Sequence, residues 1–438
     1  MTTTTRNRIK LSENQVALIW QQLIGREMVS VGDERIKIIY PGRINGDSGP
    51  DFRDAVIING ADFMQGDVEI HVNCNDWYNH GHHHDAEYNN VILHVVVWHD
   101  SDQATLLQNG KSIPMLCLPK ALQNQAYLLP YYQLPCFQIQ EHIDRQTLGK
   151  LLANAGEDRF KQKAVLFQTE LEWEEAKQVF WRGMMRALGY AKNANPFEEL
   201  ARKMPLSFIE SRNDLALKQA LLLGTAGLLP SQRMQGISIK GMGIQELEQI
   251  WQSEGEEART MKKCDWHLTH VYPNNSPVRR IIAQSHLLQR YCKSELFAGI
   301  LQLVKEVPLP AGHRVLEDGL TITSEGYWRD HFDFDVRCKT KTSALLGRSK
   351  AGEIIVNVIL PFTLSWGKMT NDLILVKKAI ELYKHYPKLT ENQITRHMVG
   401  QLCLEDISDF TACHQQGLIY IFKNNCREGK CSLCPLAS

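Results

Sequence analysis

The stretch that decides the fold of the N-terminal part of the chain is residues 49–72, which read GPDFRDAVIINGADFMQGDVEIHV. It opens with a Gly-Pro turn that places Asp51 at the start of an apolar, β-branched strand. The segment Asp67–Val72 then alternates polar and apolar residues, which is the period of a half-buried strand, so Glu69 and His71 share one face. If the two strands pair in antiparallel fashion, as the spacing of a hairpin suggests, Asp51 lies beside that face.

The segments on either side of this stretch complete a predicted α/β core over residues 1–135. Ser12–Ile24 has apolar residues at helical spacing behind a serine that can cap the helix. Arg35–Tyr40 alternates in part and predicts a strand, and Val91–Trp98 is an apolar run with the length of a buried strand. The predicted order is therefore a helix, several strands, a helix or long loop, and a further strand.

The rest of the chain differs in texture from this core. Residues 136–318 show helical periodicity and are predicted to form a mainly helical region. Residues 319–438 are predicted to form a mixed α/β region, with a strand over Gly352–Leu360, a helix over Thr370–Tyr386 and a cysteine cluster at the end. The predicted fold class is therefore α+β in three parts.

Composition limits the classes of function that the chain can have. Of the 438 residues, 43% are hydrophobic, which excludes a disordered protein. The 49 basic and 49 acidic side chains exclude a histone-like attraction to nucleic acid, although not a local basic groove. No run of about 18 apolar residues occurs, so no membrane partner is expected. The chain starts without the apolar segment of a secretory signal and has 11 cysteines, an odd number, so reduced thiols and a cytoplasmic location are expected.

Asp51, Glu69 and His71 are the first candidates for chemistry. Two carboxylates on one face make a hard oxygen site of the kind that Mg²⁺ or Mn²⁺ prefers. An imidazole beside them can orient or deprotonate water near neutral pH. The plainer interpretation is that Asp51 only caps a turn and that the other two side chains form the solvated face of a strand.

A histidine-rich segment follows directly. Seven of the 16 histidines lie between His71 and His99, far more than a uniform distribution would place there. His80, His82 and Asp85 are predicted to be auxiliary metal ligands that point back at Glu69, because imidazole suits Mn²⁺, Zn²⁺, Fe²⁺ and Ni²⁺. The alternative is an exposed polar loop with adventitious metal affinity.

This arrangement resembles the core of the PD-(D/E)xK nuclease superfamily. There a helix is followed by a hairpin carrying Pro-Asp, a strand carrying (Asp/Glu)-x-Lys, a helix and another strand. Pro50-Asp51 matches the first half of the motif and Glu69-Ile70-His71 the second, with His71 where the superfamily has lysine. Glu13, on the first helix, matches an extra carboxylate of some members. The resemblance implies a divalent-metal-dependent nuclease or phosphodiesterase in which Asp51 and Glu69 hold the metal and His71 positions water.

A second resemblance covers nearly the whole chain. It is carried by Asn45–Phe52, Gly66–Val72, the stretch from 77 to 96, Tyr327–His331 and Gln416–Ile419. These runs are similar to a bacterial family known as domain of unknown function 2851. That family implies no activity, so the functional interpretation depends on the residues themselves.

The cysteines near the end of the chain form the second candidate site. Cys426, Cys431 and Cys434 follow an apolar run and are predicted to share one metal, either Zn²⁺ or the iron of an iron–sulfur cluster. Their spacing resembles the iron–sulfur loop of the helix–hairpin–helix DNA glycosylases. The alternative is three reduced thiols on a flexible tail.

The fourth ligand of such a site is open at this point. Cys413 and His414 are candidates, but the 12 residues between Cys413 and Cys426 would span about 18 Å in a helix. Cys403 is a weaker candidate. A site with three cysteines and an open position, or with a ligand from a partner, also fits the pattern.

Three functions are consistent with these features. The leading one is a metal-dependent hydrolase of nucleic-acid phosphodiesters. The second is a catalytically inactive nucleic-acid-binding module that keeps the nuclease-like fold. The third is a metal-binding protein of other function, whose histidines do different chemistry or store metal. The relation of Asp51 to Glu69 separates them, because carboxylates placed to share one ion favour the first two.

Overall fold

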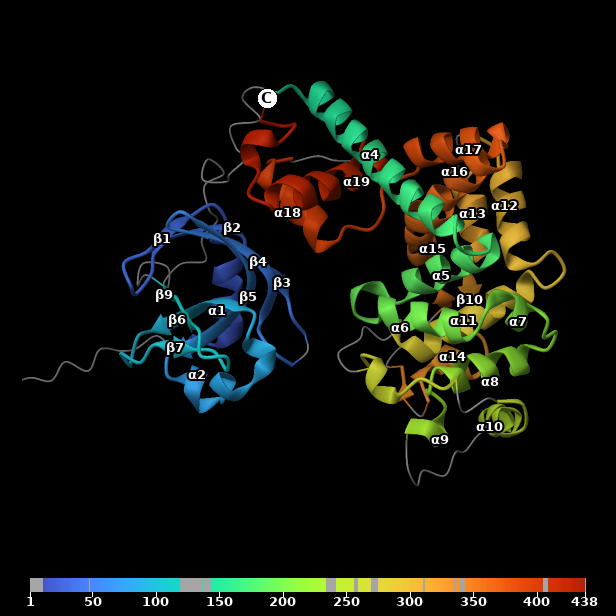
Figure 1. The fold of residues 1–438 in the computed structure, drawn as a ribbon, viewed down its shortest axis with the longest axis horizontal. Helices are drawn as coiled ribbons and strands as arrows, with labels where there is room; N and C mark the ends of the chain where they lie inside the picture. The colour runs from blue at the N-terminus through green and yellow to red at the C-terminus, as the bar shows by residue number, and fades with distance from the viewer. Residues whose placement is uncertain are drawn as a thin grey trace, which may run out of the picture. The chain divides into compact units, whose positions relative to one another are not determined.

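The chain folds into two compact units. The computed structural model (Figure 1) describes residues 11–46, 48–118, 136, 143–233, 242–255, 259–268, 275–309, 312–334, 336–338, 343–404 and 409–437. The first unit comprises Met1–Leu151, Glu391–Ser408 and Leu418–Ser438, and the second comprises Leu152–Thr390 and Asp409–Gly417. The predicted α+β fold class is confirmed, with a sheet in the first unit and mostly helices in the second. None of the described helices has both the length and the apolar character needed to cross a bilayer.

A mixed seven-stranded sheet is the centre of the first unit. Its strands are β1 (Glu27–Val29), β2 (Arg35–Tyr40), β3 (Arg43–Ile44), β4 (Phe52–Asn59), β5 (Asp62–Asn73), β6 (Val91–Trp98) and β9 (Met115–Cys117). They are ordered β1-β2-β4-β5-β6-β9, with β3 also paired to β4. Pairing is antiparallel from β1 to β5 and parallel from β5 to β9. The predicted hairpin of β4 and β5 is confirmed, with Phe52 opposite Val68.

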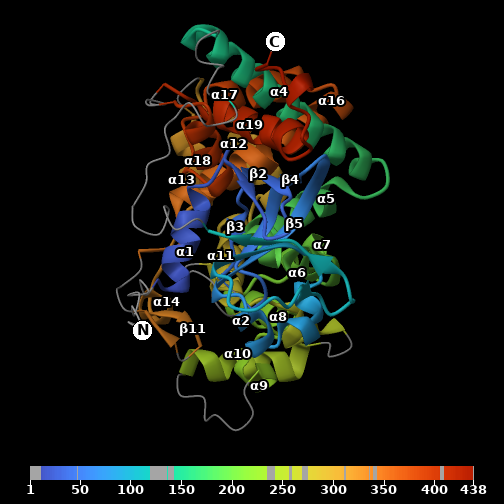
Figure 2. The same ribbon diagram turned by 90° about the vertical axis from the view of Figure 1, so that its left-hand side faces the viewer.

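Helix α1 (Glu13–Gln21) covers one face of this sheet (Figures 1 and 2). Its residues Val16 and Trp20 are buried in one cluster with Val68 and Ile70 of β5 and with residues of β2, β4 and β6. The indole Nε1 of Trp20 donates to the carbonyl of Pro41 at 2.8 Å, which satisfies its one polar atom inside the core. The helix is therefore held by apolar packing against the centre of the sheet.

The opposite face of the sheet is covered by a folded loop. It contains α2 (Asp76–Asn79) and two 3₁₀ turns, His82–His84 and Ala86–Tyr88. Trp77 is fully buried under it, and the short hairpin β7 (Thr105–Leu106) and β8 (Ser112–Ile113) adds to the cluster. The prediction that β5 is half-buried is wrong. This loop covers the polar side of the strand and α1 packs on the other side, so all residues from 66 to 71 are buried.

Segments from the end of the chain complete the first unit. Helix α18 (Gln393–Gln401) and the π-helical turn Phe422–Cys426 both contact β2. The ring of Tyr40 lies 4.9 Å from the ring of His397 and 4.9 Å from that of Phe422, edge-on in each case. Aromatic packing of this kind anchors the C-terminal segments on the N-terminal sheet.

The second unit is a helical assembly around an apolar core that includes Phe180, Phe297 and Phe362. Its helices are α5 (Ala176–Leu188), α6 (Tyr190–Lys203), α7 (Leu206–Glu210), α8 (Leu215–Thr225), α9 (Pro230–Arg233), α10 (Met242–Glu254), α11 (Pro277–Arg290), α12 (Leu296–Glu306), α13 (His313–Leu320), α14 (Tyr327–Asp330), α15 (Arg348–Ile354), α16 (Leu360–Met369) and α17 (Leu373–Lys384). Two further helices, α4 (Arg145–Leu171) and α19 (Ala412–Ile421), each contain a boundary between the units. The short strands β10 (Ile322–Thr323), β11 (His331–Asp333), β12 (Val336–Arg337) and β13 (Ala344–Leu346) pair as β10 with β13 and β11 with β12.

The predicted strand over Gly352–Leu360 is wrong. This run forms the end of α15, a π-helical turn over Ile355–Ile359 and the start of α16. Apolar residues on several sides of a segment fit a buried helix as well as a buried strand, so their periodicity does not separate the two. The predicted helix over Thr370–Tyr386 is present as α17.

Candidate functional site

The β4–β5 hairpin brings the carboxyl groups of Asp51 and Glu69 together. Asp51 follows a turn at Gly49, whose φ is +88°, and it lies next to the first residue of β4. Its backbone N–H donates to Glu69 Oε2 at 2.9 Å, and its own Oδ2 accepts from the backbone N–H of Ile70 at 3.0 Å. Each carboxylate is thus fixed by the backbone beside the other one. Two acidic groups held in this way form one site rather than two.

The electrostatics of this pair favour a bound cation. Burial raises the pKa of Glu69 well above its usual value, and repulsion from Asp51 adds to this rise. Burial also raises the pKa of Asp51, and Glu13 of α1 contributes to it. The pair therefore retains a proton near neutral pH in the metal-free protein. A dication would replace that proton, because it relieves the repulsion that makes ionisation costly.

Three histidines gather against the same carboxylate. One ring nitrogen from each of His71, His80 and His82 lies within 4.8 Å of the others. Glu69 Oε1 lies 3.3 Å from Nε2 of His82 and 3.6 Å from Nε2 of His71. His71 projects from β5, whereas the other two come from the loop that covers the sheet. The predicted ligands Glu69, His80 and His82 therefore meet, together with His71, at one point on the covered face.

A chain of hydrogen bonds orients His71. Its Nδ1 lies 2.9 Å from Nε2 of His94 on β6, and Nδ1 of His94 lies 3.0 Å from Oγ1 of Thr105. Two assignments of protons satisfy this chain, and the one in which each ring donates from Nδ1 leaves a lone pair on His71 Nε2. A ligating histidine held through its second nitrogen is the usual arrangement around protein metals.

His71, His82 and His94 are neutral, which is the form of imidazole that binds a metal. Burial, together with the neighbouring imidazoles of His94, His82 and His80, lowers the pKa of His71 to about 2. Burial likewise lowers the pKa of His82 to about 4 and that of His94 to about 3. No proton has to leave His71 or His82 near neutral pH before a metal binds.

An unsatisfied nitrogen of His82 indicates that these side chains suit a metal ion. Its Nε2 is buried but makes no hydrogen bond within the described residues, since its 3.3 Å approach to Glu69 lacks suitable geometry. A buried polar atom without a hydrogen bond is costly unless another ligand satisfies it. Three imidazoles and two carboxylates suit Mn²⁺, Fe²⁺ or Zn²⁺ better than Mg²⁺, which prefers oxygen.

The other predicted ligands lie elsewhere. Asp85 turns to the backbone, where its Oδ1 accepts from the N–H of Glu87 at 2.9 Å and caps a 3₁₀ turn. Cys426, Cys431 and Cys434 lie on the loop that ends the first unit. His94 was not among the predicted site residues, because its isolated position in an apolar strand resembles that of an ordinary core histidine.

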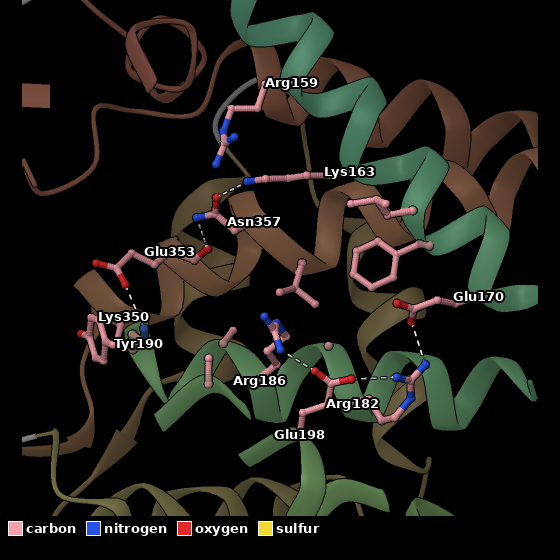
Figure 3. Close-up of a pocket in the computed structure, with 16 residues that line it drawn as sticks. Arg159, Lys163, Glu170, Arg182, Arg186, Tyr190, Glu198, Lys350, Glu353 and Asn357 are labelled. Carbon is pink, nitrogen blue, oxygen red and sulfur yellow. Dashed lines mark hydrogen bonds and ion pairs between the residues drawn. The ribbon is translucent and has the colours of Figure 1, made fainter. Parts of the chain in front are cut away.

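The second unit contains a different concave site (Figure 3). This cleft has a volume of about 830 Å³ and is lined by residues of α4, α5, α6 and α15. Arg182 at its wall lies 2.8 Å from Glu170, 2.7 Å from Glu174 and 2.9 Å from Glu198. Lys350 pairs with Glu353 at 3.0 Å. These charges are matched by ion pairs, which stabilise the walls of the cleft.

A further pair of cations faces the same cleft from α4. Arg159 donates to the amide oxygen of Gln416 at 2.8 Å, and Lys163 donates to the amide oxygens of Gln416 and Asn357. Both side chains are therefore engaged with neutral acceptors of the second unit. Figure 3 shows the bond from Lys163 to Asn357.

Fold and site together define an α+β protein with a buried histidine–carboxylate cluster on a mixed sheet. The chain belongs to the family described as Protein of unknown function (DUF2851), whose model matches residues 13–392. Comparison with curated proteins and with solved structures gave no match.

Proposed function

We propose that the protein is a divalent-metal-dependent hydrolase that cleaves nucleic-acid phosphodiesters at the histidine–carboxylate site. The observation that carries the proposal is the convergence of Asp51 and Glu69 with His71, His80 and His82 on one face of the sheet. The repulsion between the two neighbouring carboxylates supports a hydrolase or a nucleic-acid-binding module over a histidine-only metal store.

The order of elements supports the same proposal. Helix α1 precedes the hairpin that carries Pro50-Asp51 and Glu69-Ile70-His71, and β6 then lies parallel to β5. This is the order of the PD-(D/E)xK core, except that short turns replace the helix between the last two strands. Glu13 on α1 acts electrostatically on both Asp51 and Glu69, as an extra carboxylate of that core would.

The residues have distinct roles in this proposal. Asp51, Glu69 and His82 would hold the metal. His71 would present its Nε2 to the metal or to a water molecule beside it, because the hydrogen bond with His94 fixes the orientation of its ring. His80 is exposed and faces Nε2 of His71, so it can pass a proton between the site and solvent. The metal supplies stabilisation of the negative charge that develops on the phosphate and activation of a water molecule. Mn²⁺ is expected to support more activity than Mg²⁺ because of the imidazole ligands.

Substitution of Glu69 tests the proposal most directly. Glu69→Gln keeps the shape of the side chain but removes a full charge from the metal site, so Mn²⁺ affinity should fall by more than about 100-fold. Release of acid-soluble nucleotides from single- and double-stranded DNA and RNA should stop. Glu27→Gln is the matched control, because Glu27 is an exposed residue of β1 in the same unit. It should retain both affinity and activity.

Two outcomes would overturn the hydrolase. Equal nucleotide release by the wild type and Glu69→Gln would identify the activity as a contaminant. No release from any of the four substrates with Mn²⁺, Zn²⁺ or Mg²⁺ would leave the inactive binding module, which retention of labelled oligonucleotides in a gel-shift assay would then support.

A further inference from the structure

The C-terminal loop of the first unit is a compact structure rather than a loose tail. After the π-helical turn Phe422–Cys426 the chain reverses at Gly429, whose φ is +64°. The backbone N–H of Lys430 donates to the carbonyl of Asn425 at 2.9 Å, and the side-chain amide of Asn425 donates to the carbonyl of Leu433 at 3.2 Å. These bonds fold the segment that carries Cys426, Cys431 and Cys434 onto itself.

The loop is also anchored to the rest of the first unit. A Cβ atom at Gly429 would lie 2.6 Å from the ring of Phe63, so β5 and the loop touch closely at this point. Cys426 Sγ lies 3.9 Å from Sδ of Met398 on α18, and Leu436 beyond the loop is buried. The three cysteines are therefore held in place by packing.

A fourth thiol from a distant part of the sequence lies at this loop. The side chain of Cys136 is near enough to those of Cys431, Cys434 and Cys426 for their charges to act on one another. Cys136 is partly buried, as Cys426 and Cys434 are. The folded chain therefore gathers four thiols at one place in the first unit.

Two of the candidates for a fourth ligand that the sequence suggested, Cys413 and His414, are engaged elsewhere. Cys413 Sγ donates to the carbonyl of Ala153 at 3.4 Å inside the second unit. Nδ1 of His414 accepts from the backbone N–H of Thr411 at 3.1 Å, and its ring stacks on Phe410. Cys403 lies within electrostatic range of Cys136 but is not among the groups that act on Cys426.

We propose that the first unit holds an iron–sulfur cluster through four thiolates, those of Cys136, Cys426, Cys431 and Cys434. Four cysteines are the complete ligand set of such a cluster. The cluster would tie the C-terminal loop to residue 136, which precedes α4 in the chain.

A single zinc ion would require the sulfur atoms to lie closer together than they do. Zinc with Zn–S bonds of about 2.3 Å holds its four sulfurs roughly 3.8 Å apart. Among the described residues, the ligand atoms that lie within 4.8 Å of one another belong to His71, His80 and His82, and not to the cysteines. An iron–sulfur cluster needs this wider spacing, because its thiolates bind different iron atoms.

The test is the metal content of the full chain, purified without a His tag and without oxygen. Iron, zinc and acid-labile sulfide are measured per chain together with visible absorbance, for the wild type and three single variants. The wild type should contain iron and sulfide in similar amounts. Cys136→Ser should lose at least about four fifths of both, whereas Cys403→Ser and Cys117→Ser should keep the wild-type content. Cys117 is the matched control, because it is a partly buried thiol of the same unit outside the group.

A second measurement on the wild type covers the case in which Cys136→Ser does not fold. Mass spectrometry after alkylation should show the four proposed ligands protected in the native protein and modified after iron chelation. The exposed Cys264 should react in both states. Wild-type iron content in Cys136→Ser, one zinc per chain without sulfide, or alkylation of all four thiols before chelation would each overturn the cluster. None of these results depends on the histidine–carboxylate site.

Discussion

Buried ionisable groups are stabilised differently in the two units. In the first unit, Asp51 and Glu69 lie beside neutral imidazoles, and the raised pKa of Glu69 keeps a proton on the pair near neutral pH. In the second unit, Arg182 is only 10% exposed, yet three glutamates lie within 3 Å and balance its charge. The charges of an ion pair already neutralise each other, whereas a carboxyl pair that holds a proton can exchange it for a cation. The comparison therefore favours the first unit for the candidate chemistry, although the second unit contains a cleft of about 830 Å³.

The pH dependence of metal binding should show the largest effect. Because the folded site holds a proton on its carboxyl pair and none on His71, metal binding releases this proton and metal affinity rises with pH. One proton per ion gives roughly a tenfold rise per pH unit, or about 300-fold from pH 6 to pH 8.5. Isothermal titration calorimetry with Mn²⁺ in two buffers of different ionisation enthalpy measures both the affinity and the protons released. An affinity that does not change over this range would show that the carboxyl groups are already ionised, and the contrast between the units would then disappear.

Loss of the central arginine in the second unit should be the next largest effect. Arg182→Met leaves Glu170, Glu174 and Glu198 without their shared partner. The free energy needed to unfold α5 and α6 locally should therefore fall by about 2–3 kcal/mol. The value lies below that of a fully buried pair, because two of the glutamates are more than a third exposed and water screens them. Hydrogen exchange of peptides from α5 and α6 measures this loss. Arg35→Met removes an exposed ion pair of β1 and β2 and should cost less than about 1 kcal/mol in its own unit. If the two substitutions lowered stability equally, the ion pairs of Arg182 would contribute no more than an exposed surface pair does.

The smallest effect should come from the residue that orients the site. His94→Phe fills the space of the imidazole but leaves Nδ1 of His71 without its partner, so Mn²⁺ affinity should fall about 10- to 100-fold. His99→Phe is the control, because His99 is exposed just after the same strand. If His94 served only as packing, the phenylalanine variant would bind Mn²⁺ as the wild type does, with its stability alone changed.

Local pattern was sufficient to predict the hairpin and the face shared by Glu69 and His71. A period of two residues fixes which side chains lie together on one strand, and the Gly-Pro turn marks where the strand begins. His94 could not be found in this way, because its place opposite Glu69 depends on the parallel pairing of β5 with β6. Local sequence patterns do not predict which strands pair when no short turn joins them.

The roles of Asp85 and Cys136 could also be recognised only in the folded chain, because they depend on contacts that the local sequence does not determine. Asp85 has the residue type and spacing of a ligand, but its carboxylate accepts a hydrogen bond from the backbone N–H of Glu87 in the following turn. Cys136 lies 290 residues before Cys426, and no spacing rule links cysteines over such a distance. The run 352–360 shows the same limit for secondary structure, since burial on all sides removes the periodicity that separates a strand from a helix.

The division of the first unit into three stretches of sequence affects its assembly during synthesis. Its sheet comes from the first 118 residues, but α18 and the C-terminal loop that contact it follow the main segment of the second unit, Leu152–Thr390. About 240 residues are made in between, which at 5–20 residues per second takes a ribosome roughly 10–50 s. During that interval Tyr40 lacks His397 and Phe422, the rings that pack against it in the folded unit. The nascent chain therefore presents an apolar patch that chaperones can recognise, and a ribosome stalled before residue 391 would leave it permanently exposed.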